Sequence, residues 1–227
     1  MTPRHHLDEA TLVSFAAGAL SPEMAAVAAT HLEACRHCRA LLGDAERIGG
    51  QLLGQQQPPG NAAARSMQLR QAMLGLLDEA PGANAAQMPG ARDKGELSPG
   101  PDRLPVSLQA YFGSSWSSLR WRWMAPGVHM IRAAHTSGDK LILLKIAPGK
   151  SMPLHSHEGT ELTQVLMGAY DDALGHFGPG DAADLDPATE HQPVTSPGVP
   201  CICVAALDAP LRFRGWLARK LQPMVGL

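Results

Sequence analysis

The stretch that decides the N-terminal fold is HLEACRHC, residues 31–38, where one histidine and two cysteines follow the pattern H-x-x-x-C-x-x-C. Imidazole nitrogens and cysteine thiolates are the ligands that zinc prefers, and structural zinc sites hold four protein ligands in a tetrahedron. On a helix, positions i, i+4 and i+7 lie on one face. His31, Cys35 and Cys38 can therefore converge on one ion, and the sequence predicts a zinc site.

The fourth ligand must come from another part of the chain, and two adjacent histidines, His5 and His6, precede the first expected helix. That helix can begin at Asp8 and a second at Ser21, because Asp and Ser accept hydrogen bonds from the free amides of a first turn. The apolar spacing predicts a third helix from about residue 38 to residue 53. So small a unit buries little apolar surface, and a zinc ion that joins the helix ends would stabilise it.

A fourth helix is predicted over residues 62–79, beyond the break QQQPPG at residues 55–60. Its larger apolar residues recur at i, i+4, i+7 and i+8, which places them on one face. These residues are Leu69, Met73, Leu76 and Leu77. Such a face must be covered by the first helices, by another domain or by a partner protein, and the break before the helix favours a partner.

Residues 80–105 are rich in Pro, Gly, Ala and Asn without periodicity, and we expect them to form an interdomain linker. From residue 106 to residue 227 the pattern changes to short strands between Pro-Gly and similar turns, with a short tail helix expected over residues 216–221. The clearest strand is KLILLKI, residues 140–146. The sequence thus predicts a multidomain α + β protein, with a helical domain over residues 1–79 and then an all-β sandwich or small barrel.

A second cluster of possible metal ligands begins with PLHSHEGTE, residues 153–161. In a strand, His155 and His157 point to the same face, and a turn after them can bring Glu161 alongside. His191 follows on a separate segment. Three imidazoles and a carboxylate suit Zn, Fe, Mn, Ni or Cu, so we expect a second metal site that holds zinc or another divalent transition metal.

This stretch resembles the first motif of the cupin family, in which Gly is followed by His-x-His, then Glu, then Gly at fixed intervals. The matching positions are Gly149, His155, His157, Glu161 and Gly168. The second cupin motif is only partly kept, since Gly180 and Pro187 precede His191 at shortened spacing. The resemblance implies a cupin barrel over residues 106–227.

A helical domain stabilised by zinc and followed by a cupin domain resembles the ChrR-type anti-sigma factors. The resemblance covers both domains but not the linker. The resemblance implies a 1:1 heterodimer with an extracytoplasmic-function (ECF, group IV) sigma factor, which the helical domain would keep from core RNA polymerase. It also implies release of that sigma factor in oxidative stress, when the cupin senses singlet oxygen or peroxides. The ligands carried over are His6, His31, Cys35 and Cys38 for the first zinc, and His155, His157, Glu161 and His191 for the cupin metal. The candidates for sigma-factor contact are Leu69, Met73, Leu76 and Leu77.

The composition of the chain excludes some classes of function. The net charge is −2, and residues 1–60 carry more acids than bases, so we expect no direct contact with nucleic acid. No apolar run reaches the length of a membrane span and residues 1–8 lack a secretory core, so we expect a cytoplasmic protein without membrane contact. The alternative function is a metal-dependent, dioxygenase-like cupin enzyme with a helical dimerisation module. No acid–base pair is evident beyond the ligands, so we expect no enzymatic activity.

Overall fold

The computed structural model describes residues 2–56, 62–78 and 102–213. The chain divides into two compact units, of which one combines Met1–Gly49 with Pro101–Leu227 and the other is Gly50–Gly100. The first unit therefore contains both the stretch HLEACRHC and the β-rich part of the chain. No described helix is both long enough and apolar enough to cross a membrane.

Four α-helices make up the N-terminal part: α1 (Glu9–Ala16), α2 (Pro22–Ala34), α3 (Arg36–Gln55) and α4 (Ala62–Asp78). The Asp8 side chain accepts a hydrogen bond from the amide of Ala10, and the Ser21 side chain accepts one from the amide of Met24. These are the N-terminal caps that the sequence predicts for the first two helices. The prediction of about four helices ahead of a β-rich part is confirmed.

Short helical turns open the β-rich part: η1 (Val106–Leu108), α5 (Gln109–Phe112) and η2 (Trp116–Ser118). The expectation of strands from residue 106 onward is therefore wrong as far as Arg122, where β1 begins. The physical reason is a tertiary contact, because the Glu33 carboxylate of α2 accepts hydrogen bonds from the amides of Val106 and Ser107, at 3.1 and 2.8 Å. A carboxylate at the start of a helix stabilises the free amides of its first turn.

The described strands pair in three antiparallel sheets. The six-stranded sheet has the order β1-β2-β3-β10-β5-β8, with bounds Arg122–Ala125, Val128–Arg132, Lys140–Ile146, Cys201–Leu207, Glu161–Met167 and Ala182–Leu185. The smaller sheets are β11-β4 (Leu211–Phe213 and His155–His157) and β7-β6-β9 (Gly175–Phe177, Tyr170–Asp172 and Val194–Thr195). The predicted all-β architecture is confirmed as cupin-like, although backbone pairing among the described strands does not close one continuous barrel.

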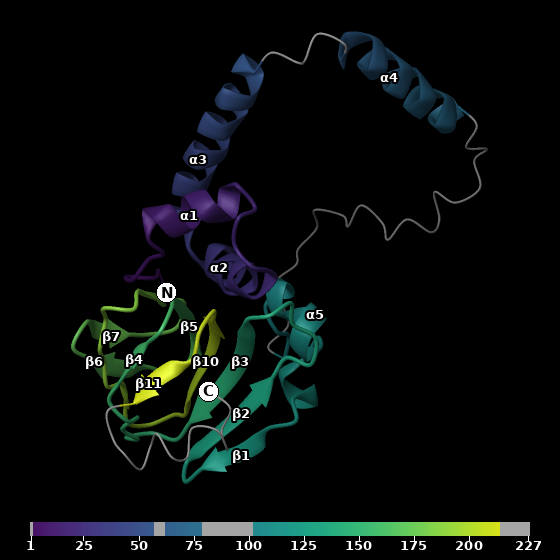
Figure 1. Cartoon of the computed structure of the whole chain (residues 1–227). Coiled ribbons are helices and arrows are strands. Elements are labelled where there is room, and N and C mark those ends of the chain that lie inside the picture. Colours follow the sequence, from purple (N-terminus) through teal and green to yellow (C-terminus); the bar gives the residue numbers. More distant parts are fainter. Residues whose placement is uncertain (1, 57–61, 79–101, 214–227) are drawn as a thin grey trace. The chain divides into compact units, whose positions relative to one another are not determined.

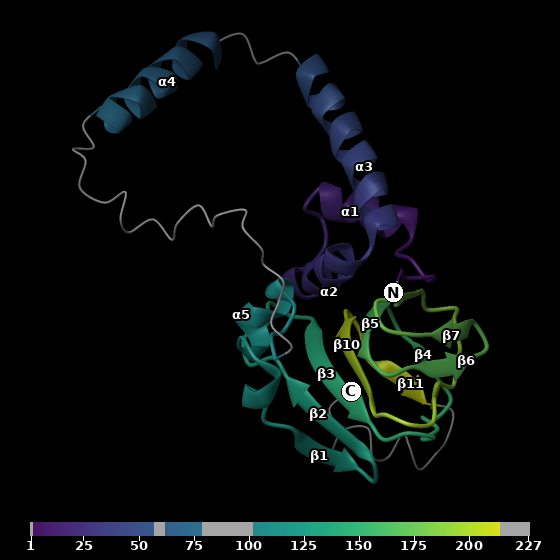
Figure 2. The ribbon, with the colours of Figure 1, turned by 180° about the vertical axis from the view of Figure 1, so that it is seen from behind.

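Helix α2 lies against the six-stranded sheet, as Figures 1 and 2 show from opposite sides. Val27 and Ala28 of α2 are fully buried in one hydrophobic cluster with Leu143 of β3 and with Val204 and Ala206 of β10. The first helices and the cupin-like sheet thus share a core, although residues 80–105 separate them in the sequence. Most of that expected linker, and the tail helix expected over residues 216–221, lie outside the described residues.

Candidate metal centres

The first group of possible ligands forms where the N-terminal segment meets the junction of α2 and α3. His6 precedes α1, His31 lies near the end of α2, Cys35 follows α2 directly, and Cys38 lies in the first turn of α3. One ligand atom from each of the four residues lies within 4.8 Å of the others. The four sequence-predicted side chains are therefore brought together.

The spacing of these atoms fits a tetrahedral zinc ion. His31 Nε2 lies 3.3 Å from Cys38 Sγ, while His6 Nδ1 lies 3.3 Å from Cys35 Sγ and 3.7 Å from Cys38 Sγ. Ligand atoms bonded to zinc at about 2.0–2.3 Å in a tetrahedron lie roughly 3.3–3.8 Å from one another. The donor set and its spacing therefore agree with a closed zinc site.

The protein environment favours the metal-binding form of His31 and opposes that of Cys38. Burial lowers the pKa of His31 to about 4, so its ring is neutral at pH 7 and can donate a lone pair. Burial raises the pKa of Cys38 to about 11 in the absence of a metal. A bound zinc ion stabilises the thiolate and displaces that proton, so metal binding here releases a proton.

The structure separates the two adjacent N-terminal histidines. His5 stacks on Phe177 with ring centroids 4.0 Å apart, and its Nε2 lies 3.1 Å from the carbonyl oxygen of His176. His5 is thus held by the cupin-like part, whereas His6 points into the group of cysteines. This placement agrees with the assignment of His6, rather than His5, as the fourth ligand.

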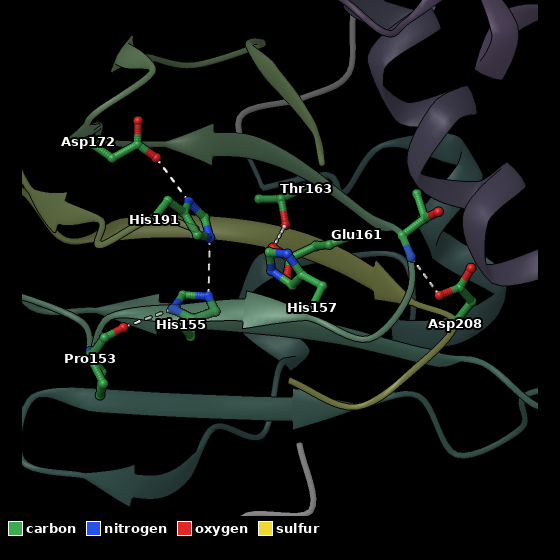
Figure 3. Close-up of polar contacts among 9 residues, drawn as sticks. Pro153, His155, His157, Glu161, Thr163, Asp172, His191 and Asp208 are labelled. Carbon is green, nitrogen blue, oxygen red and sulfur yellow. Dashed lines mark hydrogen bonds and ion pairs between the residues drawn. The ribbon is translucent and has the colours of Figure 1, made fainter. Parts of the chain in front are cut away.

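The second group consists of His155 and His157 on β4 together with His191, all buried. His155 Nε2 and His191 Nε2 lie only 3.1 Å apart (Figure 3). The Nδ1 atom of His155 faces the carbonyl oxygen of Pro153 at 2.8 Å and that of His191 faces the Asp172 carboxylate at 3.0 Å. Both Nδ1 atoms must carry the proton, so two Nε2 lone pairs face each other and repel unless a cation lies between them.

His157 gives a second indication that this group fits a metal ion. Neither of its ring nitrogens has a hydrogen-bond partner among the described residues, although both are buried. Its Nε2 lies 3.0 Å from Glu161 Oε2 without the alignment of a hydrogen bond. Buried polar atoms without partners are costly and rare, and coordination of a metal ion would satisfy one of the two nitrogens.

Glu161 lies beside the three histidines and is not part of the group that they form. Its Oε1 accepts a hydrogen bond from the Thr163 hydroxyl at 2.7 Å. Burial acts to raise the pKa of Glu161, but the contacts with His157, His155 and Thr163 outweigh it and hold the pKa at about 2. The carboxylate is therefore ionised at pH 7, and its role as a fourth ligand stays a prediction.

The candidate partner residues on α4 are exposed. Leu69, Met73 and Leu76 expose 57%, 67% and 68% of their surface, and the side chain of Leu77 lies outside the described residues. The late part of α3 also exposes large apolar side chains, which the sequence analysis did not single out as a partner surface. These are Ile48, Leu52 and Leu53.

A helical part with a His₂Cys₂ group packs on a cupin-like sheet with a His₃ group, so the chain is a two-part protein with two candidate metal centres. The family model described as the ChrR cupin-like domain matches residues 112–209. Over 224 residues, 98% of each chain, this chain is 38% identical to the anti-sigma-E factor ChrR of Cereibacter sphaeroides. The crystal structure of Rhodobacter sphaeroides SigE in complex with the anti-sigma ChrR matches with a TM-score of 0.71 and 32% identity, covering 92% of this chain and 100% of that chain. The chain therefore belongs to the ChrR family of anti-sigma factors.

Proposed function

We propose that this chain is a zinc-dependent anti-sigma factor that binds one ECF (group IV) sigma factor and keeps it from core RNA polymerase. It acts in the cytoplasm, where RNA polymerase works, and it acts by binding rather than by catalysis. The similarity over almost the whole chain to an anti-sigma-E factor supports the class of partner. The match to a chain in a complex of SigE with ChrR supports a 1:1 assembly.

The single observation that carries the proposal is the exposed apolar face of α4, formed by Leu69, Met73 and Leu76. Burial of apolar surface is favourable by about 25 cal/mol per Å², so a helix face of this kind gains free energy when a partner covers it. Amphipathic helices use i, i+4 and i+7 anchors of this type to dock into apolar grooves. The sigma factor would supply that groove.

In this proposal the first metal group has a structural role. His6, His31, Cys35 and Cys38 hold a zinc ion with four protein ligands, which leaves no open coordination position. The ion fixes the N-terminal segment and the start of α3 to the end of α2. It thereby sets the direction in which α3 leaves α2.

The second metal group has the sensory role. His155, His157 and His191 supply three ligands, and zinc or another divalent transition metal suits them. Even with Glu161 as a fourth ligand, most metals of this kind have room for a further small molecule. A metal held by these residues would supply a centre that reacts with peroxides or singlet oxygen, and its alteration would release the sigma factor.

Co-expression of the full chain with the sigma factor encoded beside it tests the proposal. We expect a 1:1 heterodimer by size-exclusion chromatography with light scattering, and inhibition of transcription from a promoter of that sigma factor. Replacement of Cys35 and Cys38 by Ser should abolish both. The matched control Cys201→Ala removes a buried thiol of β10 that is not part of the first group, and it should abolish neither. Recovery of a free, fully active sigma factor beside folded, zinc-loaded protein would contradict the proposal.

A further inference from the structure

The turn at residues 178–181, between β7 and β8, contacts the helical part of the chain from within the cupin-like part. Its backbone is fixed to β5, since the Gly180 amide donates to the Val165 carbonyl at 2.8 Å and the Val165 amide donates to the Asp181 carbonyl at 3.0 Å. The Asp181 side chain closes the turn by accepting from the Gly178 amide at 2.8 Å. The turn is therefore a firm part of the sheet and not a loose loop.

The carbonyl oxygen of Gly180 faces Nδ1 of His31 at 2.9 Å. A carbonyl oxygen can only accept, so the ring proton lies on Nδ1 and the lone pair of Nε2 points toward Cys38 Sγ, 3.3 Å away. Gly180 also has φ +93°, and a Cβ at this position would lie 3.2 Å from Pro3 Cγ. Only glycine combines this backbone conformation with so close an approach of the turn to the helical part.

The Asp181 carboxylate holds the segment that leads to the other histidine of the first group. Its Oδ1 accepts hydrogen bonds from the backbone amides of Arg4 and His5, the latter at 3.0 Å. The amide of Ala182 donates back to the His5 carbonyl at 3.3 Å. These bonds fix the backbone directly before His6, whose Nδ1 faces Cys35 and Cys38.

We propose that this turn of the cupin-like part is an outer shell of the first metal site, in which Gly180 positions His31 and Asp181 positions His6. The inference rests on the zinc assignment made under Proposed function. Residues that hold the ligands of a metal orient those ligands and raise its affinity. Docking of the cupin-like sheet and zinc affinity are therefore coupled, and by thermodynamic reciprocity zinc strengthens the docking as much as docking strengthens zinc binding.

Titration of the full chain with Co²⁺ tests the role of Asp181. Only thiolate ligation gives the sulfur-to-cobalt charge-transfer absorption. Co²⁺ bound to the His₃ group therefore adds nothing to that absorption band. Asp181→Ala should lower the Co²⁺ affinity of the thiolate site about 10- to 100-fold. The matched control is Asp186→Ala, which removes an exposed carboxylate that braces the turn after β8 by accepting from Ala188 and Thr189. It should leave the affinity unchanged.

Wild-type affinity in folded Asp181→Ala would overturn the proposal. Absence of the charge-transfer band in the unsubstituted protein would instead overturn the zinc assignment itself, so the two failures are distinguishable.

Hydrogen exchange tests the reciprocal effect without a substitution in the turn. In a His157→Ala protein, whose cupin group has lost a ligand, removal of zinc from the first site should speed exchange in a peptide that covers residues 178–182. Exchange in residues 122–132, which form β1 and β2, should not change. Equal exchange in residues 178–182 with and without zinc would overturn the coupling, even if Asp181→Ala fails to fold.

Discussion

Asp172 and His191 form a buried carboxylate–imidazole pair, with 3.0 Å between Asp172 Oδ2 and His191 Nδ1 and almost no exposure of either side chain (Figure 3). The pair connects β6 to the His₃ group, because the opposite nitrogen of His191 faces His155. A carboxylate behind a metal-binding imidazole fixes the tautomer and raises the basicity of the ligand. We therefore expect Asp172 to position His191 for a metal ion in the second group, a role that its place in the sequence does not indicate.

Asp172→Asn should weaken metal binding at the cupin group about 10- to 100-fold, because the amide oxygen accepts a hydrogen bond but carries no charge. Metal content after dialysis, measured by mass spectrometry, checks this. The neighbouring Asp171 offers a matched control, since it pairs with exposed His176 at 2.8 Å in the same manner. Asp171→Asn should keep the full metal content, and an equal loss in both variants would contradict the assignment.

The choice between the two N-terminal histidines gives a second prediction. His6→Ala should strongly weaken Co²⁺ binding at the thiolate site and shift its visible spectrum, because a protein ligand is replaced by water. His5→Ala should keep the spectrum of a tetrahedral His₂Cys₂ site, since His5 stacks on Phe177 instead. A spectrum that changes in His5→Ala and not in His6→Ala would reverse the assignment.

Much of the fold and of both metal groups was predictable because the signals are local. The caps at Asp8 and Ser21 act within one helical turn, and the H-x-x-x-C-x-x-C motif places three ligands within eight residues. The expectation that one helix face carries them is wrong, because α2 ends at Ala34 and Cys35 has extended backbone before α3 begins. The His-x-His pair at residues 155 and 157 is equally local, since alternate residues of a strand share a face. His191 lies on a distant segment, and the resemblance to cupins strengthened its assignment to the same group.

The packing of α2 on the sheet was not predictable, because it depends on contacts between distant segments. Glu33 accepts from the amides of residues 106 and 107, which turns an expected strand into a helical turn. Glu23 appears in the sequence as an ordinary acid in a first helical turn, yet it is buried and bonded to Ser137. The contact of the Gly180 carbonyl oxygen with His31 could not be predicted, because every residue has a backbone carbonyl and the sequence does not show which one accepts a given hydrogen bond.

Glu23 leads to a prediction about pH. Its carboxylate accepts from both the amide and the hydroxyl of Ser137, each at 2.8 Å, and this contact joins α2 to the β2–β3 connection. Burial acts to raise the pKa of Glu23, but these hydrogen bonds outweigh it and lower the pKa below its usual 4.5. A lowered pKa stabilises the folded state above pH 4.5, and the contribution is lost as pH falls through the folded-state value.

Glu23→Gln should therefore lower the free energy of unfolding by about 1–3 kcal/mol at pH 7. The difference from the unsubstituted protein should shrink as pH falls below 4.5, which urea unfolding at several pH values measures. Glu46→Gln on the exposed surface of α3 is the control and should have little effect at any pH. If the difference in unfolding free energy between Glu23→Gln and the unsubstituted protein grows toward low pH, the pKa of Glu23 is raised rather than lowered.

The exposed face of α4 gives a prediction about the partner. Leu69→Asp with Met73→Asp should weaken binding of the sigma factor by at least 100-fold, because two charges would have to enter an apolar groove. Met67 and Leu74 are also exposed, but they lie on the opposite face of the same helix. Met67→Asp with Leu74→Asp should change the dissociation constant less than about 10-fold, and equal losses would show that both faces are covered.

Substitution of His157 tests whether the sigma factor is bound and released by different parts of the protein. The residue belongs to the cupin group and is not one of the His₂Cys₂ ligands, so His157→Ala should still form the 1:1 complex with the sigma factor. The variant should release the sigma factor poorly after treatment with singlet oxygen or an organic peroxide, because the sensory metal is lost.

The cupin group is connected to the first site through a few elements. His191 bonds Asp172 of β6, β6 pairs with β7, and β7 leads into the turn at residues 178–181 that holds His31. Transcription from the sigma-dependent promoter, measured before and after the oxidant, checks this, with His176→Ala as the exposed control. Full induction in His157→Ala would place the sensor outside the cupin group, and constitutive activity would give that group a structural role in binding instead.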